Sequence, residues 1–271
     1  HSQDTAGPMA RSVRDCALLL AALTEKAFDY TSALDTNALK GARLGVVRQY
    51  FGFHEPTDRV FTDVLAQLER AGAVLIDPVT LPAIETIGDA ELTVLLYELK
   101  ADLNAYLAWL GPNSPVKTLA DVIAFNERHA ERELRWFGQE LFIKAQAKGP
   151  LTDAEYQDAR AQCLRVAATE GISAQLQTHR LDALIAPTGG PAWLTDLALG
   201  DHIVGGSTTP AAVAGTPSLT VPAGMVHGLP LGLSFFAGAG SEAQLLGLAY
   251  AFEQATQARR PPRYLPTTRV G

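Results

Sequence analysis

The sequence predicts an α/β fold in which a β-sheet core, flanked by helices, carries a helical insertion. A strand, a helix and a second strand follow one another within residues 42–76, and residues 88–180 are mostly of helical pattern. Residues 181–271 then return to short apolar strands in surroundings rich in Gly and Pro. A strand–helix–strand unit of this length implies two parallel strands joined by a right-handed crossover.

Apolar spacing predicts each element in chain order. Helices are expected where apolar residues recur every three or four positions, and strands where short apolar runs lie between Gly or Pro residues. Within residues 152–155, the run Thr-Asp-Ala-Glu resembles a capping box. The Gly- and Pro-rich segment 189–228 contains no predicted helix. The predicted helices are 9–23, 56–70, 91–110, one or two within 119–146, 152–179 and 241–257, and the predicted strands are 42–48, 73–76, 182–186, 218–221 and 231–236.

Composition excludes several classes of protein. Of the 271 residues, 47% are hydrophobic and 19% charged, which argues against a disordered chain or a coiled coil. The net charge of −7 disfavours a nucleic-acid partner, because such binding depends on neutralising phosphates. The longest apolar stretches are far shorter than a membrane span needs. We therefore expect neither nucleic acid nor a membrane as a partner.

The cysteines and the first residues of the chain indicate where the protein is located and whether the sequence is part of a longer one. Cys16 and Cys163 lie in helix-like apolar contexts, where buried free thiols are expected. No secretory signal is visible, and a cytoplasmic location is expected. The chain begins with His1 instead of Met, and its first residues are typical of the middle of a protein. We expect a longer protein or a removed N-terminus.

The residues alone identify no nucleophile. None of the six histidines has the spacing of a metal motif, and no nucleotide-binding loop or GxSxG elbow is present, so no metal or cofactor is expected. The turn over residues 205–209 (GGSTT) is compatible with backbone N–H groups facing an oxyanion. A packing loop explains the same turn and is the favoured interpretation.

Three separated stretches together resemble the amidase signature family. Each is moderately specific alone, whereas their order and spacing fit the family over nearly the whole chain. The stretches are residues 2–13 (SQDTAGPMARSV), 182–188 (DALIAPT) and 214–224 (AGTPSLTVPAG), the last followed by 228–233 (GLPLGL). In the middle, residues 97–107 and 123–126 are similar to the bacterial branch that includes peptide amidases.

The resemblance implies a fold and an activity. The fold would be a mixed β-sheet with flanking helices, and residues 1–271 would be the C-terminal portion of a single amidase-signature domain, with 88–180 as its helical cap. Enzymes of the family hydrolyse carboxamide C–N bonds with a Ser–Ser–Lys triad, an activated nucleophile beside an oxyanion site. That triad precedes the stretch matching residues 2–13. The resemblance therefore places no catalytic residue in this chain, which alone should be inactive.

Eight residues are candidates for contact with a small-molecule or peptide amide. By position in the family, two would lie near the active-site floor and three would line the substrate pocket. Three aromatic residues are further candidates, although packing explains them as well. In that order they are Asp4 and Thr5; Ser207, Thr208 and Thr209; and Tyr97, Phe125 and Trp193. The other expected partner is the upstream segment of the same protein.

Two alternatives stay open at this point. The transamidating (A-type) component of an aminoacyl-tRNA amidotransferase shares the fold, although the acidic balance and the peptide-amidase-like middle argue against it. A truncated relative that serves in binding or as a scaffold is the non-enzymatic alternative. A reading frame that continues far upstream of His1 would exclude this second alternative.

Overall fold

The computed structural model describes residues 1–24 and 28–264 and divides the chain into two compact units. The helical unit comprises His1–Gln3 and Glu85–Val166, and the sheet unit comprises Asp4–Ile84 and Ala167–Gly271. The predicted domain range to residue 271 thus extends past the described residues. Within residues 1–24 and 28–264, no helix combines the length and apolar character needed to cross a bilayer.

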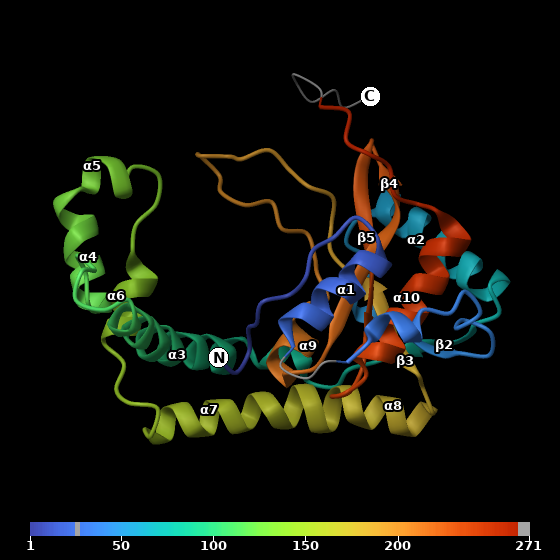
Figure 1. Ribbon diagram of the computed structural model, residues 1–271, viewed down its shortest axis with the longest axis horizontal. Helices are drawn as coiled ribbons and strands as arrows, with labels where there is room; N and C mark the ends of the chain where they lie inside the picture. Colours follow the sequence, from blue (N-terminus) through green and yellow to red (C-terminus); the bar gives the residue numbers. More distant parts are fainter. Residues whose placement is uncertain (25–27, 265–271) are drawn as a thin grey trace. The chain divides into compact units, whose positions relative to one another are not determined.

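The sheet unit is built on five strands in the order β2-β1-β3-β5-β4 (Figure 1). β1 pairs in parallel with β2 and β3, whereas β5 pairs antiparallel with β3 and β4. The predicted parallel strand–helix–strand unit and the mixed sheet with flanking helices are both confirmed. The strands are β1 (Arg43–Val47), β2 (Val74–Val79), β3 (Ala183–Pro187), β4 (Ser218–Val226) and β5 (Leu229–Phe236), and the α-helices of this unit are α1 (Val13–Leu23), α2 (Glu55–Arg70), α8 (Ala174–His179), α9 (Thr209–Ala214) and α10 (Glu242–Thr256).

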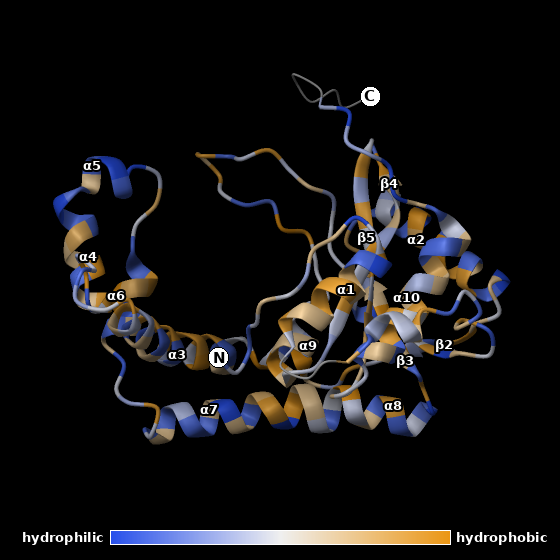
Figure 2. Ribbon diagram, viewed as in Figure 1, coloured by the Kyte–Doolittle hydropathy of each residue, from blue (hydrophilic) through white to orange (hydrophobic). Residues whose placement is uncertain are grey.

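The main hydrophobic core lies between one face of this sheet and helices α1, α2 and α10. Leu231, Leu233 and Phe235 alternate along β5 and are fully or almost fully buried there, beside Phe61 of α2 and Phe252 of α10. The apolar residues of α10 stand out in Figure 2. Each large side chain buried in this way contributes about 1.5–3 kcal/mol. Alternation along β5 turns Gly232 and Ser234 to the opposite face of the sheet.

The helical unit contains most of the predicted helical segment 88–180, whereas residues 167–180 belong to the sheet unit. The α-helices of the helical unit pack around α3, which contacts α4, α6 and α7, and a small apolar cluster of Leu96, Leu119 and Ala145 lies among them. They are α3 (Gly88–Trp109), α4 (Leu119–Arg128), α5 (Ala130–Glu133), α6 (Glu140–Gln146) and α7 (Ala154–Leu164). A π-helical segment, Arg165–Ser173, continues from α7 to α8 and interrupts the single helix predicted over 152–179.

Three local predictions were wrong for identifiable reasons. The first helix begins at Val13 and not at residue 9, because the Ser12 side chain accepts a hydrogen bond from the Asp15 N–H and caps the helix there. Residues 119–146 form three helices instead of one or two. The short helix α9 was not predicted. Pro210 in its first turn and Gly215 at its end are residue types that also occur in loops, and the segment was therefore assigned to a loop.

The predicted capping box at residues 152–155 is also wrong. α7 does begin at Ala154, but the side chain of its N-cap residue Asp153 makes no capping bond within the part of the chain that the structure describes. The carboxylate of Glu155 instead accepts hydrogen bonds from Tyr97 and Lys148. A reciprocal capping box occurs at α4, between Thr118 and Asp121.

Candidate functional site

Three hydroxyl groups meet on the face of the sheet opposite the main core. The register of β4 and β5 sets Thr220 directly opposite Ser234. Thr188 follows β3 and brings its Oγ1 to 2.6 Å from Thr220 Oγ1 and 2.8 Å from Ser234 Oγ. We call these three side chains the hydroxyl cluster. It joins residues that are distant in sequence at one place on the sheet.

One hydroxyl proton of the hydroxyl cluster is not used in hydrogen bonds within the cluster. Three hydroxyl groups carry three protons, and the two hydrogen bonds among them use two. Ser234 is buried, whereas Thr220 is exposed. If Ser234 donates to Thr188 and Thr188 donates to Thr220, the Thr220 proton points to an outside acceptor. The cluster can therefore present a hydrogen-bond donor at Thr220.

Gly232 makes room for the hydroxyl cluster. A Cβ atom at this position would lie 2.6 Å from Thr220 Oγ1 and 2.9 Å from Thr188 Oγ1. Both distances are shorter than a carbon–oxygen contact tolerates, because packed heavy atoms are most favourable at about 3.5–4.0 Å. Only glycine fits here without displacing the two threonine side chains.

Ser207 fastens the Gly-rich turn to the end of β3. Its side chain is fully buried, and its hydroxyl donates to the carbonyl oxygen of Pro187 at 2.8 Å. Its N–H donates to the carbonyl oxygen of Thr188 at 3.2 Å, and Gly189 and Gly206 form an isolated antiparallel bridge. The turn is thereby held beside the hydroxyl cluster, with Ser207 serving as an anchor within the chain.

The remaining candidates of the sheet unit are accessible. Thr208 is exposed, and Thr209 is half-buried at the start of α9. Asp4 and Thr5 are exposed, and the Asp4 carboxylate accepts a hydrogen bond from the Thr5 N–H at 2.8 Å. Trp193 lies on the segment that leaves β3 and is 42% exposed. Contact of any of these residues with a substrate stays a prediction.

Tyr97 of the helical unit is held within its own unit. Its side chain is buried, and its hydroxyl donates to Glu155 Oε2 at 2.7 Å and lies 3.2 Å from Asp153 Oδ2. The hydrogen bond to Glu155 raises the pKa of Tyr97, with burial acting in the same direction. The Lys148 ammonium, 2.5 Å from Glu155 Oε1, lowers the pKa of that carboxyl group. Tyr97 therefore keeps its proton and serves as a donor inside this cluster.

Phe125, the other candidate of the helical unit, lies on α4. Its ring centroid is 4.4 Å from that of His129, and its side chain is 40% exposed. Asn126, the next residue, donates to Gln139 Oε1 at 3.1 Å, which ties α4 to the segment before α6. Phe125 is thus set on a fixed helix with an accessible ring. A role in substrate contact stays a prediction here also.

Sequence reasoning missed the members of the hydroxyl cluster as site residues. Thr188 lies within the stretch 182–188 and Thr220 within 214–224, and Ser234 directly follows residues 228–233. The signal that could have found them is the alternation of small polar residues with buried apolar ones along β5 and β4. Alternation gives the face of each strand, but the pairing of β3 with β5 was needed to bring Thr188 to the other two.

The chain belongs to the amidase family, whose model, described as Amidase, matches residues 1–246. A peptide amidase in complex with the competitive inhibitor chymostatin is 45% identical, with a TM-score of 0.91 over 97% of this chain and 56% of that chain. The native peptide amidase from Stenotrophomonas maltophilia is 44% identical, with a TM-score of 0.88 over 97% of this chain and 55% of that chain.

Curated relatives extend the comparison. A probable amidase of Arabidopsis thaliana is 34% identical over 97% of this chain and 50% of its own length. The A-type component of the glutamyl-tRNA(Gln) amidotransferase of Pseudomonas savastanoi pv. phaseolicola is 30% identical over 94% of this chain and 56% of its own length. The chain therefore spans about half the length of the curated relatives it matches.

Proposed function

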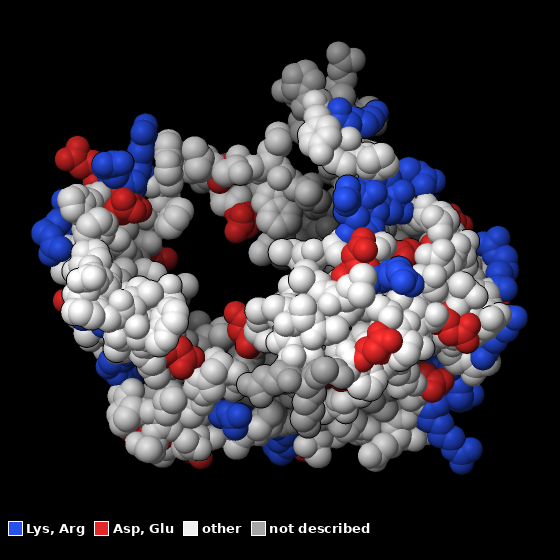
Figure 3. Space-filling model, in the orientation of Figure 1, with Lys and Arg blue, Asp and Glu red and all other residues white. Residues whose placement is uncertain are grey.

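We propose that the complete protein hydrolyses carboxamide C–N bonds and that C-terminal amides of peptides are its substrates. The observation that carries this proposal is the 45% identity and TM-score of 0.91 shared with a peptide amidase over 97% of this chain. The similarity of residues 97–107 and 123–126 to the same branch of the family supports it. Acidic and basic side chains are interspersed on the face drawn in Figure 3.

The proposal assigns the bond-breaking step to residues outside this chain. A Ser–Ser–Lys triad in an upstream segment would supply the nucleophile, the proton-passing serine and the base. This chain would contribute the substrate-facing surface around the hydroxyl cluster. There the Thr220 hydroxyl would donate a hydrogen bond to a carbonyl oxygen of the substrate. The hydrogen bonds with Thr188 and Ser234 would fix the direction of that O–H group.

A pair of threonine variants in the complete protein tests this role. Thr220→Val removes the hydroxyl and keeps the side-chain shape, whereas Thr62→Val removes a hydroxyl that only donates to the Asp58 carbonyl within α2. We expect Thr220→Val to lower kcat/KM for a peptide amide by about fivefold, the value of one modest hydrogen bond, and Thr62→Val to leave it unchanged. Equal kcat/KM values for wild type and Thr220→Val would remove Thr220 from the substrate surface.

The sequence relatives favour one second candidate function. The 30% identity with the A-type component of a glutamyl-tRNA(Gln) amidotransferase fits a protein that releases ammonia from glutamine for a partner. The net charge of −7 argues against direct binding of tRNA by this chain. Release of ammonia from glutamine only in the presence of partner proteins would support this candidate. Release of ammonia from peptide amides without any partner would support the first.

A further inference from the structure

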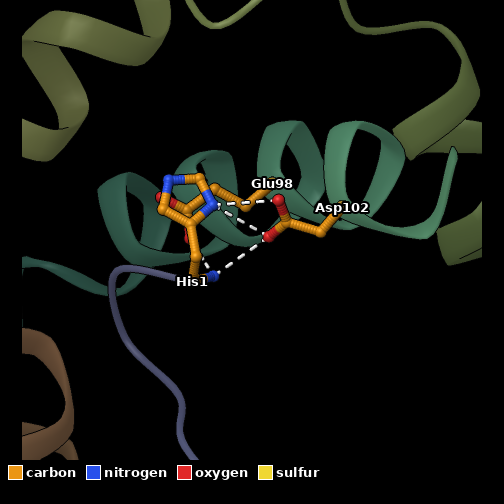
Figure 4. Close-up of side chains that lie close together, drawn as sticks. All are labelled: His1, Glu98 and Asp102. Carbon is orange, nitrogen blue, oxygen red and sulfur yellow. Dashed lines mark hydrogen bonds and ion pairs between the residues drawn. The ribbon is translucent and has the colours of Figure 1, made fainter. Parts of the chain in front are cut away.

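A histidine and two carboxylates converge on helix α3 of the helical unit (Figure 4). His1 Nδ1 lies 2.8 Å from Asp102 Oδ2 and 3.0 Å from Asp102 Oδ1. One nitrogen or oxygen atom from each of His1, Glu98 and Asp102 can be chosen so that all three lie within 4.8 Å of one another. The side chains point toward a common space, as ligands of one ion would.

The carboxylates of Glu98 and Asp102 are spaced so that a nearby positive charge would stabilise both. Glu98 and Asp102 are four residues apart on α3 and so lie on the same face of the helix. Like charges at this spacing destabilise a helix unless a cation offsets them. In the structure the backbone nitrogen of His1 lies 3.1 Å from Glu98 Oε2 and 3.1 Å from Asp102 Oδ2. The space between the two carboxylates thus accommodates a group that both carboxylates attract.

Glu98 is oriented by its neighbours in the way that metal ligands usually are. It is 3% exposed; the Tyr156 hydroxyl donates to its Oε1 at 2.8 Å, and the Ser2 N–H donates to its Oε2 at 3.0 Å. A carboxylate offers about four lone-pair positions, so these two bonds and the contact with the His1 nitrogen leave one position for a further partner. Hydrogen bonds of this kind fix a ligating carboxylate in most metal sites.

We infer that His1, Glu98 and Asp102 form a binding site for a divalent transition-metal ion, with Zn²⁺ as the representative ion. An imidazole nitrogen suits zinc, nickel or copper, whereas Mg²⁺ and Ca²⁺ prefer oxygen ligands alone. Ligands about 2.0–2.2 Å from Zn²⁺ lie roughly 3–4 Å from one another. His1 and Asp102 are each about half exposed, at 49% and 47%, so small rotations bring them to that spacing.

Calorimetric titration of ZnCl₂ and MgCl₂ into the chain tests the site, and His202 supplies the matched control. His202 Nε2 lies 3.1 Å from Asp196 Oδ2, which makes a similar exposed pair. In the parts of the chain that the structure covers, this pair belongs to no cluster of three candidate ligands. We expect one equivalent of Zn²⁺ to bind and Mg²⁺ not to bind. His1→Gln and Asp102→Asn should each weaken Zn²⁺ binding at least about tenfold, and His202→Gln should not.

A second form of the chain, with one residue added before His1, separates the side chains from the amino group. If the side chains are the ligands, this form still binds one Zn²⁺, and crystals soaked in ZnCl₂ show an anomalous peak between His1 and Asp102. Loss of binding in the extended form would overturn the inference. The same holds for undiminished binding by Asp102→Asn, or for equal weakening by His202→Gln.

Discussion

The hydroxyl of Ser207 donates to the carbonyl oxygen of Pro187 at 2.8 Å, in a fully buried position of the sheet unit. Ser207 lies in the Gly-rich turn before α9, and Pro187 is the last residue of β3. This bond fixes the turn to the strand end that carries Thr188. The Ser207 hydroxyl therefore holds the turn against the strand end, and contact of Ser207 with a substrate stays a prediction.

Ser207→Ala should destabilise the protein by about 1–3 kcal/mol, because it leaves the buried carbonyl of Pro187 without its side-chain donor. Thr208→Ala, at an exposed neighbouring position, should change the free energy of unfolding by less than about 0.5 kcal/mol. Urea unfolding of both variants measures the difference. Equal stability of the two variants would show that the Ser207 hydroxyl does not hold the turn.

Gly232→Ala should disrupt the hydroxyl cluster, since the new methyl group would lie 2.6 Å from Thr220 Oγ1. We expect a lower melting temperature and, in the complete protein, a lower kcat/KM for peptide amides. Gly88→Ala is the matched control, because a Cβ atom at Gly88 meets no heavy atom within 4 Å. If Gly232→Ala melts at the same temperature as Gly88→Ala, the close packing around the cluster is not as described.

Both thiols should be unreactive while the chain is folded. Cys16 and Cys163 are buried, as predicted, and desolvation raises the pKa of each thiol. Since the thiolate is the reactive form, a disulfide reagent such as DTNB at about pH 8 should label neither residue before unfolding and both in about 6 M guanidinium chloride. Labelling of one thiol in the native chain at the rate of free cysteine would contradict the burial.

The N-terminus of α4 should weaken in acid. The N–H of Lys117 and the side chain and N–H of Thr118 lower the pKa of Asp121 in the folded chain. Ionised Asp121 therefore stabilises the helix fully above its unfolded pKa of about 3.9, and this stabilisation is lost as the pH falls through the folded pKa.

Thermal unfolding of wild type and Asp121→Asn between about pH 2 and pH 6 measures this effect. The wild type should melt at the higher temperature at the upper end of this range, and the difference between the two proteins should shrink toward the acid end. A difference that stays constant over the whole range would show that the charge of Asp121 does not contribute.

Local patterns predicted much of the fold, and long-range pairing explains what they missed. The parallel pair of β1 and β2 followed from a strand, a helix and a strand in sequence, because each element has its own apolar period. The period could not identify α9, which is only six residues long. The residue types of 152–155 also suggested that Glu155 belongs to a capping box. Hydrogen bonds from Tyr97 and Lys148, which both lie outside that motif, determine instead where the Glu155 carboxylate lies.

The candidate sites illustrate the same limit. Thr188, Thr220 and Ser234 are brought together by strand pairing that no single segment reveals. His1 and Asp102 are 101 positions apart, so no spacing rule for metal ligands could have joined them. The family resemblance did supply the family and the sheet type, because nearly all residues of its three motifs lie in the sheet unit.

The most direct test of the proposed function is the release of ammonia from a C-terminal peptide amide, measured for the product of the complete reading frame and for residues 1–271 alone. We expect the complete protein to release ammonia and the matching free peptide acid without any partner protein, and we expect the chain alone to release none. Hydrolysis by residues 1–271 at the rate of the complete protein would contradict an upstream triad, and failure of the complete protein to release ammonia would contradict the amidase proposal itself.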